Sequence, residues 1–206
     1  MPLSRFALCT WAAIMLASLT VARAEDYSDP SWPCVQRKVQ SLSLGLMWPH
    51  PVPDDTLSPS LADPAHELVQ TLLLRRVPEE QISALTTDFG ATYPDLTIDK
   101  LGLIFRDAFT GINRERSQLI DGIGRYSLTQ IDLATRIEDA RLAFDAEMAK
   151  ADPDFDHLDA LEEQLAWDER IYRDRAQSLT YVCETPVLLE KRAYAIAQAL
   201  GQLVPD

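Results

Sequence analysis

Four acidic residues lie at the first, third, fifth and twelfth places of a twelve-residue stretch that reads DPDFDHLDALEE. They are Asp152, Asp154, Asp156 and Glu163. Carboxylates that alternate in a short loop supply the several hard oxygen ligands that Ca²⁺ prefers. The spacing therefore predicts a cation site in this loop, with calcium as its cofactor.

This stretch resembles the calcium-binding loop of EF-hand proteins, and its Pro153 is shared with some periplasmic lanthanide-binding EF-hand proteins. The resemblance covers twelve residues and implies metal binding between two helices. The stretch departs from the EF-hand pattern at two places. The sixth place, where a glycine makes the sharp turn, holds His157, and the eighth place holds Asp159 instead of an aliphatic residue.

The same residues also fit the start of a helix. Asp152 or Asp156 can accept hydrogen bonds from the first free N–H groups, and Pro153 suits the first helical turn. Acidic side chains are also favoured near the positive end of the helix dipole. We favour this capping interpretation and keep the metal site as the alternative.

The first 24 residues have the pattern of a secretory signal peptide. Arg5 precedes an apolar run, and Ala22 and Ala24 stand where a signal peptidase reads small residues. Cleavage would leave Glu25 as the first residue. No later segment is apolar enough to cross a bilayer. The sequence therefore predicts a periplasmic or secreted protein.

Two cysteines, Cys34 and Cys183, remain after the predicted cleavage. In an oxidising compartment an isolated pair of this kind predicts a structural disulfide. A redox-active pair is the alternative, but it would favour a CxxC spacing that the chain lacks.

The composition limits the classes of partner. The chain has 19 basic and 32 acidic residues and a net charge of −13. Coulomb repulsion therefore argues against nucleic acid or an anionic lipid surface as the partner. Another envelope protein is the partner that we expect.

We expect residues 25–63 to form a proline-rich irregular arm, in which residues 34–48 could hold a short helical turn or an extended segment. The run WPHPVP, from Trp48 to Pro53, excludes a helix because proline lacks an N–H and constrains its predecessor. Trp32, Trp48 and His50 are candidate partner-binding residues on this arm. The alternative is that they pack back onto the folded domain.

Residues 64–206 follow a helical pattern. Apolar residues recur at three-and-four spacing, in heptad-like stripes. They predict helices that begin after Asp63, at Pro78, after Thr97, after Tyr126, at about Phe155 and at Thr185–Pro186. Ser127 and Gln130 form a capping-box pattern, and the glycines of the preceding GIG, residues 122–124, predict a helix end or kink. We therefore expect an all-α fold, an antiparallel helical bundle dominated by a long helical hairpin.

The chain lacks the motifs of the common catalytic and cofactor sites, including zinc, haem, nucleotide and serine-hydrolase patterns. We therefore expect an exported protein that acts by binding, as an envelope adaptor, accessory subunit or chaperone-like factor, and not as an enzyme. Cation binding through residues 152–163 is the first alternative. An enzyme that uses carboxylates is the second.

Overall fold

The structure is a computed structural model that describes residues 29–204, so the predicted signal peptide lies outside the described residues. The arm contains a short 3₁₀ turn, η1, and four helices follow it. Their bounds are Leu44–Leu46 for η1, Pro59–Leu73 for α1, Glu79–Thr92 for α2, Ile98–Met148 for α3 and Phe155–Gly201 for α4. No strand occurs in the described part of the chain, and the all-α prediction is confirmed.

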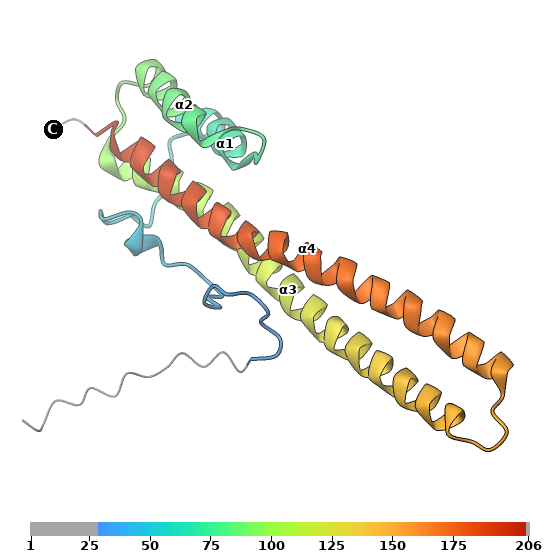
Figure 1. The fold of residues 1–206 in the computed structure, drawn as a ribbon. Helices are drawn as coiled ribbons and strands as arrows, with labels where there is room; N and C mark the ends of the chain where they lie inside the picture. The colour runs from blue at the N-terminus through green and yellow to red at the C-terminus, as the bar shows by residue number, and fades with distance from the viewer. Residues whose placement is uncertain (1–28, 205–206) are drawn as a thin grey trace, which may run out of the picture.

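Helices α3 and α4 run antiparallel and form a long hairpin (Figure 1). At 1.5 Å per residue, the 51 residues of α3 extend about 75 Å. The end of the hairpin near the C-terminus is called the base, and the turn at residues 149–154 is called the tip. Helices α1 and α2 and the arm all lie along the basal half, whereas the other half projects as two helices alone (Figure 1).

The contact between α3 and α4, here called the seam, repeats every seven residues as in a coiled coil. On α4 the repeat comprises Leu158, Leu165, Tyr172, Leu179, Pro186, Ala193 and Leu200. On α3 it comprises Phe109, Arg116, Ile123, Gln130, Ile137 and Phe144. The apolar members come together because burying them removes hydrocarbon surface from water.

The predicted break in α3 near residue 124 is wrong, because the helix is continuous from Ile98 to Met148. Ser127 does not cap a helix; its hydroxyl donates to the carbonyl of Pro30 in the arm at 2.8 Å. Gln130 donates from Nε2 to the carbonyl of Tyr172 in α4 at 3.1 Å. The capping-box spacing thus arises from two side chains that make tertiary hydrogen bonds.

Two predicted helix starts at prolines are also wrong. Helix α1 begins at Pro59, five residues before Pro64, where the carbonyl of Ser58 accepts from the N–H of Ala62 at 2.9 Å. Helix α4 passes through Pro186, which is buried. An interior proline removes one helical hydrogen bond and costs about 3 kcal/mol, so packing at the base must offset this loss.

The main core lies at the base, where α1 and α2 cover the ends of α3 and α4. Trp48 of the arm stacks on Phe105 of α3, with ring centroids 5.4 Å apart. The fully or nearly fully buried aliphatic side chains of this core include Leu72, Ile82, Leu101, Ile104, Ile112, Ile196 and Leu200.

Arg192 of α4 fastens the turn between α1 and α2 to the hairpin. Its guanidinium is buried and donates to three carbonyls, those of Leu72 at 2.6 Å, Leu74 at 2.8 Å and Val77 at 2.9 Å. These carbonyls lie at the C-terminal end of α1 and just beyond it, where helical partners are missing. Burial lowers the pKa of Arg192 from its ordinary value.

We predict that Arg192→Met lowers the free energy of unfolding by about 3 kcal/mol, because buried carbonyls lose a charged donor. Urea unfolding followed by circular dichroism measures this change. Arg76→Met is the matched control, because Arg76 is exposed in the same turn and should change stability by less than about 0.5 kcal/mol. Equal effects of the two substitutions would contradict this account of the turn.

Candidate functional site

The acidic stretch forms the tip of the hairpin and the first turns of α4. Asp154 is the N-cap residue, and its Oδ1 accepts from the backbone N–H of His157 at 3.1 Å. The capping interpretation therefore holds, although the cap is Asp154 and not Asp152 or Asp156. Glu163 lies in the third turn of α4.

The buried carboxylate of Glu147 closes the tip from the end of α3. It accepts from the backbone N–H of Asp154 at 3.0 Å and from the Nζ of Lys150 at 2.5 Å. The side-chain hydrogen bond from Lys150 and the backbone hydrogen bond lower the pKa of Glu147. Within residues 29–204 no group of three His, Cys, Asp or Glu side chains is placed to hold a metal. The calcium hypothesis stays a prediction that this geometry does not test.

The candidate partner-binding residues of the arm lie in three different settings. Trp48 is 2 % exposed and is part of the main core, so it does not offer an exposed docking ring. His50 is exposed, and its ring makes a T-shaped contact with Trp48, with ring centroids 5.7 Å apart. Trp32 is half-buried against the disulfide and donates to the carbonyl of Gln36 at 2.6 Å. The alternative of packing back onto the domain is therefore correct for Trp48.

Cys34 of the arm and Cys183 of α4 form the predicted disulfide, with their Cα atoms 5.5 Å apart. The two cysteines are buried and pack against Ile123 of α3, with Trp32 at the edge of this small cluster. The disulfide therefore joins the arm, α3 and α4 at the middle of the hairpin.

Polar side chains of α3 hold the backbone of the arm along the basal half. Their partners run from base to middle in the order Arg106 to Pro53 and Asp55, Asn113 to Leu42, Arg116 to Val39, Ser117 to Gln40, and Ser127 to Pro30. The arm thus lies antiparallel to α3. These six hydrogen bonds all use backbone groups of the arm, so they hold the arm whatever its side chains are at those positions.

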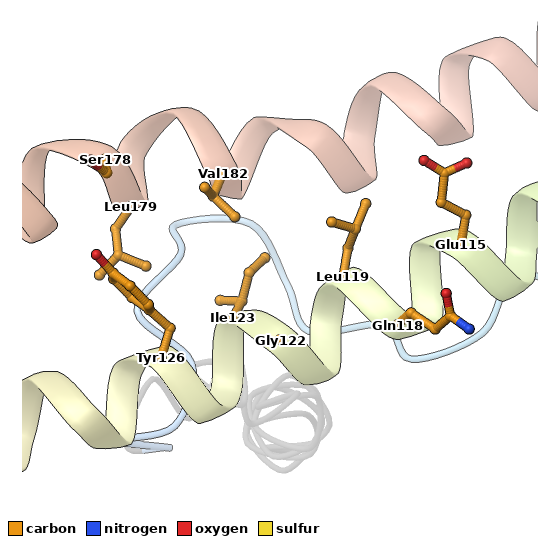
Figure 2. A pocket seen from close by; sticks show the side chains of 9 residues that line it. All are labelled: Glu115, Gln118, Leu119, Gly122, Ile123, Tyr126, Ser178, Leu179 and Val182. Atoms are coloured by element: carbon orange, nitrogen blue, oxygen red, sulfur yellow. The ribbon is translucent and has the colours of Figure 1, made fainter. Parts of the chain in front are cut away.

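A groove of about 370 Å³ opens between α3 and α4 at the middle of the hairpin (Figure 2). Leu119 and Ile123 of α3 and Leu179 and Val182 of α4 point into the space between the helices (Figure 2). The remaining lining residues are Glu115, Gln118, Gly122, Tyr126 and Ser178. A pocket of this size with mainly apolar walls and few polar groups is typical of a binding site.

Gly122 keeps this groove open. A Cβ atom added at Gly122 would meet nothing closer than the Nη2 of Arg125 at 3.9 Å. Gly124, about 200° further around the helix, faces the carbonyl of Ser31 in the arm instead. In Figure 2 the arm passes behind the two helices. Gly122 and Gly124, which predicted a helix break, therefore lie on two different faces of the continuous helix α3. Gly122 faces the groove and Gly124 faces the arm.

The disulfide supports the groove from the side of the arm. Ile123 both packs against Cys34 and Cys183 and lines the groove. A second hollow of about 460 Å³, between α1 and α3, shares Glu115 and Gln118 with the groove. The recessed surface therefore continues from the middle of the hairpin toward α1.

No residue pattern considered above predicts the groove. The pattern that could have revealed it is the GIG segment inside an unbroken heptad repeat, because a glycine at an inner edge of a coiled coil leaves a gap. Comparison of the chain with protein-family models, with curated proteins and with solved structures finds no match.

We predict that backbone N–H groups at the tip become less protected from hydrogen exchange in acid. The pKa of Glu147 is lower in the folded protein than in the unfolded chain, so its contribution is fully present above its ordinary value of 4.5. That contribution is lost as the pH falls through the lowered pKa. The protection factors for amide hydrogen exchange at Asp154 and His157, taken relative to the intrinsic rate at each pH, should therefore fall at low pH in the wild type. Glu147→Gln should lower these protection factors at neutral pH also, and unchanged protection in this variant would refute the role of Glu147.

Proposed function

We propose that this protein is an exported helical-bundle binding protein, an envelope adaptor or accessory subunit. Its binding site is the groove between α3 and α4, and its ligand is the apolar side of a helix from another envelope protein. The observation that carries the proposal is the apolar groove of about 370 Å³ that Gly122 leaves in the seam.

The position of the groove supports a helical ligand. Toward the base, α1 packs on α3 and α2 packs on α4, so further helices complete the bundle there. Farther from the base than α1 and α2, helices α3 and α4 form the apolar walls of the groove. A helix from a partner can lay side chains into such a groove at three-and-four spacing.

The arm supports the proposal in a second way. It covers the other side of the same segment of α3 and is fixed there by hydrogen bonds to Asn113, Ser117 and Ser127. Pre-organised walls reduce the ordering cost that binding must meet. The groove therefore needs no large rearrangement to accept a ligand.

The proposed export rests on two features of the chain. The opening residues have the pattern of a signal peptide, and Cys34 and Cys183 are paired. Disulfides of this kind persist in oxidising compartments. In the described part of the chain, no helix has the length and apolar character that a membrane span requires.

Site-specific photocrosslinking tests this proposal. A photoreactive phenylalanine analogue at the exposed Gln118 should capture an envelope protein in intact cells. Gly122→Phe fills the groove and should reduce the yield about tenfold, because overpacking costs about 1–3 kcal/mol. Gly122→Ala, which leaves most of the space open, should retain the crosslink. Equal yields from the two variants, or no captured protein at all, would overturn the proposed function.

A further inference from the structure

Helix α4 carries a second line of large side chains that faces solvent. Trp167 is 61 % exposed, Tyr181 is 68 % exposed and Leu188 is 51 % exposed. Together with Asp174 they stand seven residues apart, in the sequence order Trp167, Asp174, Tyr181 and Leu188. Residues seven apart share one side of a helix. This outer line is not part of the seam, whose α4 residues are Leu165, Tyr172 and Leu179 in the same segment.

The outer line is complementary to itself when two copies of α4 lie antiparallel. With a two-fold axis beside Gln177, Trp167 of one copy faces Leu188 of the other. Asp174 then faces Tyr181, so that a phenol hydroxyl can donate to a carboxylate. The symmetry repeats each contact, because a two-fold interface uses the same patch on both copies.

Charged residues beside the outer line fit the same register. A neighbouring line on the exposed face of α4 reads Glu163, Arg170, Gln177, Glu184 and Lys191, again with a spacing of seven. In the antiparallel register Glu163 faces Lys191, Arg170 faces Glu184, and Gln177 faces its own copy on the axis. A parallel arrangement brings together residues at equal height, so it pairs neither Glu163 with Lys191 nor Arg170 with Glu184. Opposite charges across an interface select the antiparallel arrangement.

These four charged side chains are available for a partner. Among the ion pairs within residues 29–204, none involves Glu163, Arg170, Glu184 or Lys191. The half of the hairpin that carries Trp167 also projects beyond α1, α2 and the arm (Figure 1).

The area suits a reversible dimer. A contact from Glu163 to Lys191 is about 42 Å long at 1.5 Å per residue, and one helix is about 10–12 Å wide. Two copies would then bury roughly 1,000 Å² in total, which is the lower bound for a specific interface.

We propose that the outer face of α4 binds a second copy of this chain, as an antiparallel two-fold dimer centred at Gln177. The proposal does not depend on the binding function of the groove. The outer line and its flanking charges lie on the exposed side of α4, whereas the groove lies between α3 and α4.

Cysteine crosslinking in the full-length exported protein tests the register. Under mild oxidation, the double variant Asp174→Cys with Tyr181→Cys should form a covalent dimer, because these positions face each other across the axis. Gln177→Cys alone should also crosslink. Asp174→Cys alone should remain a monomer on a non-reducing gel, since its own copy lies about 10 Å away, too far for a disulfide. Crosslinking of Asp174→Cys alone as readily as of the double variant, or a double variant that stays monomeric, would overturn the register.

Sedimentation velocity of charge-swap variants tests the interface itself. Arg170→Glu should raise the dimer dissociation constant about tenfold or more, because two like-charge contacts replace two ion pairs. Arg170→Glu combined with Glu184→Arg should restore the wild-type value. A wild-type chain that is monomeric at about 100 μM, or a double variant as weak as the single one, would overturn the dimer. Neither result would affect capture at Gln118, so failure of the dimer is distinguishable from failure of the groove.

Discussion

The seam between α3 and α4 is the contact on which the other parts of the structure depend. Helical propensity acts within one helix and cannot align two helices of 51 and 47 residues with each other, and in proteins most helical stability comes from packing of an amphipathic face. Burial of heptad-spaced side chains along the whole length supplies the alignment. Helices α1 and α2, the arm, the groove and the tip all take their positions from this pair.

Polar residues inside the seam fix its register. Gln130 donates to a carbonyl of α4, and Arg116 reaches both the arm at Val39 and the carboxylate of Glu190 at 3.8 Å. A uniform apolar seam could slip by one heptad without losing contacts, whereas a buried polar group loses its partner when the helices slip. Arg116 also binds the arm to the hairpin, so one side chain links the alignment of the helices to the placement of the arm.

The two halves of the hairpin differ in how fully they are covered, and this difference suggests where the molecule acts. The basal half carries the main core, the buried Arg192 and the arm. The projecting half has a narrow seam and exposes Trp167 and Leu142. The groove at Gly122 lies at the boundary between the halves, and the outer line of α4 crosses this boundary, from Trp167 in the projecting half to Leu188 in the basal half.

The sequence by itself determined the helical class, the long hairpin, the pairing of Cys34 with Cys183 and the role of an aspartate as cap at the tip. Each of these depends on local periodicity, on cap chemistry or on the simple arithmetic of two cysteines. Only the tertiary structure decided that Ser127 and Pro186 lie inside continuous helices, that Trp48 is buried and that Gly122 opens a groove. The physical reason is that the neighbouring sequence of a serine, proline, tryptophan or glycine is the same whether the residue faces water or another segment of the chain. Packing between residues far apart in the chain makes that choice.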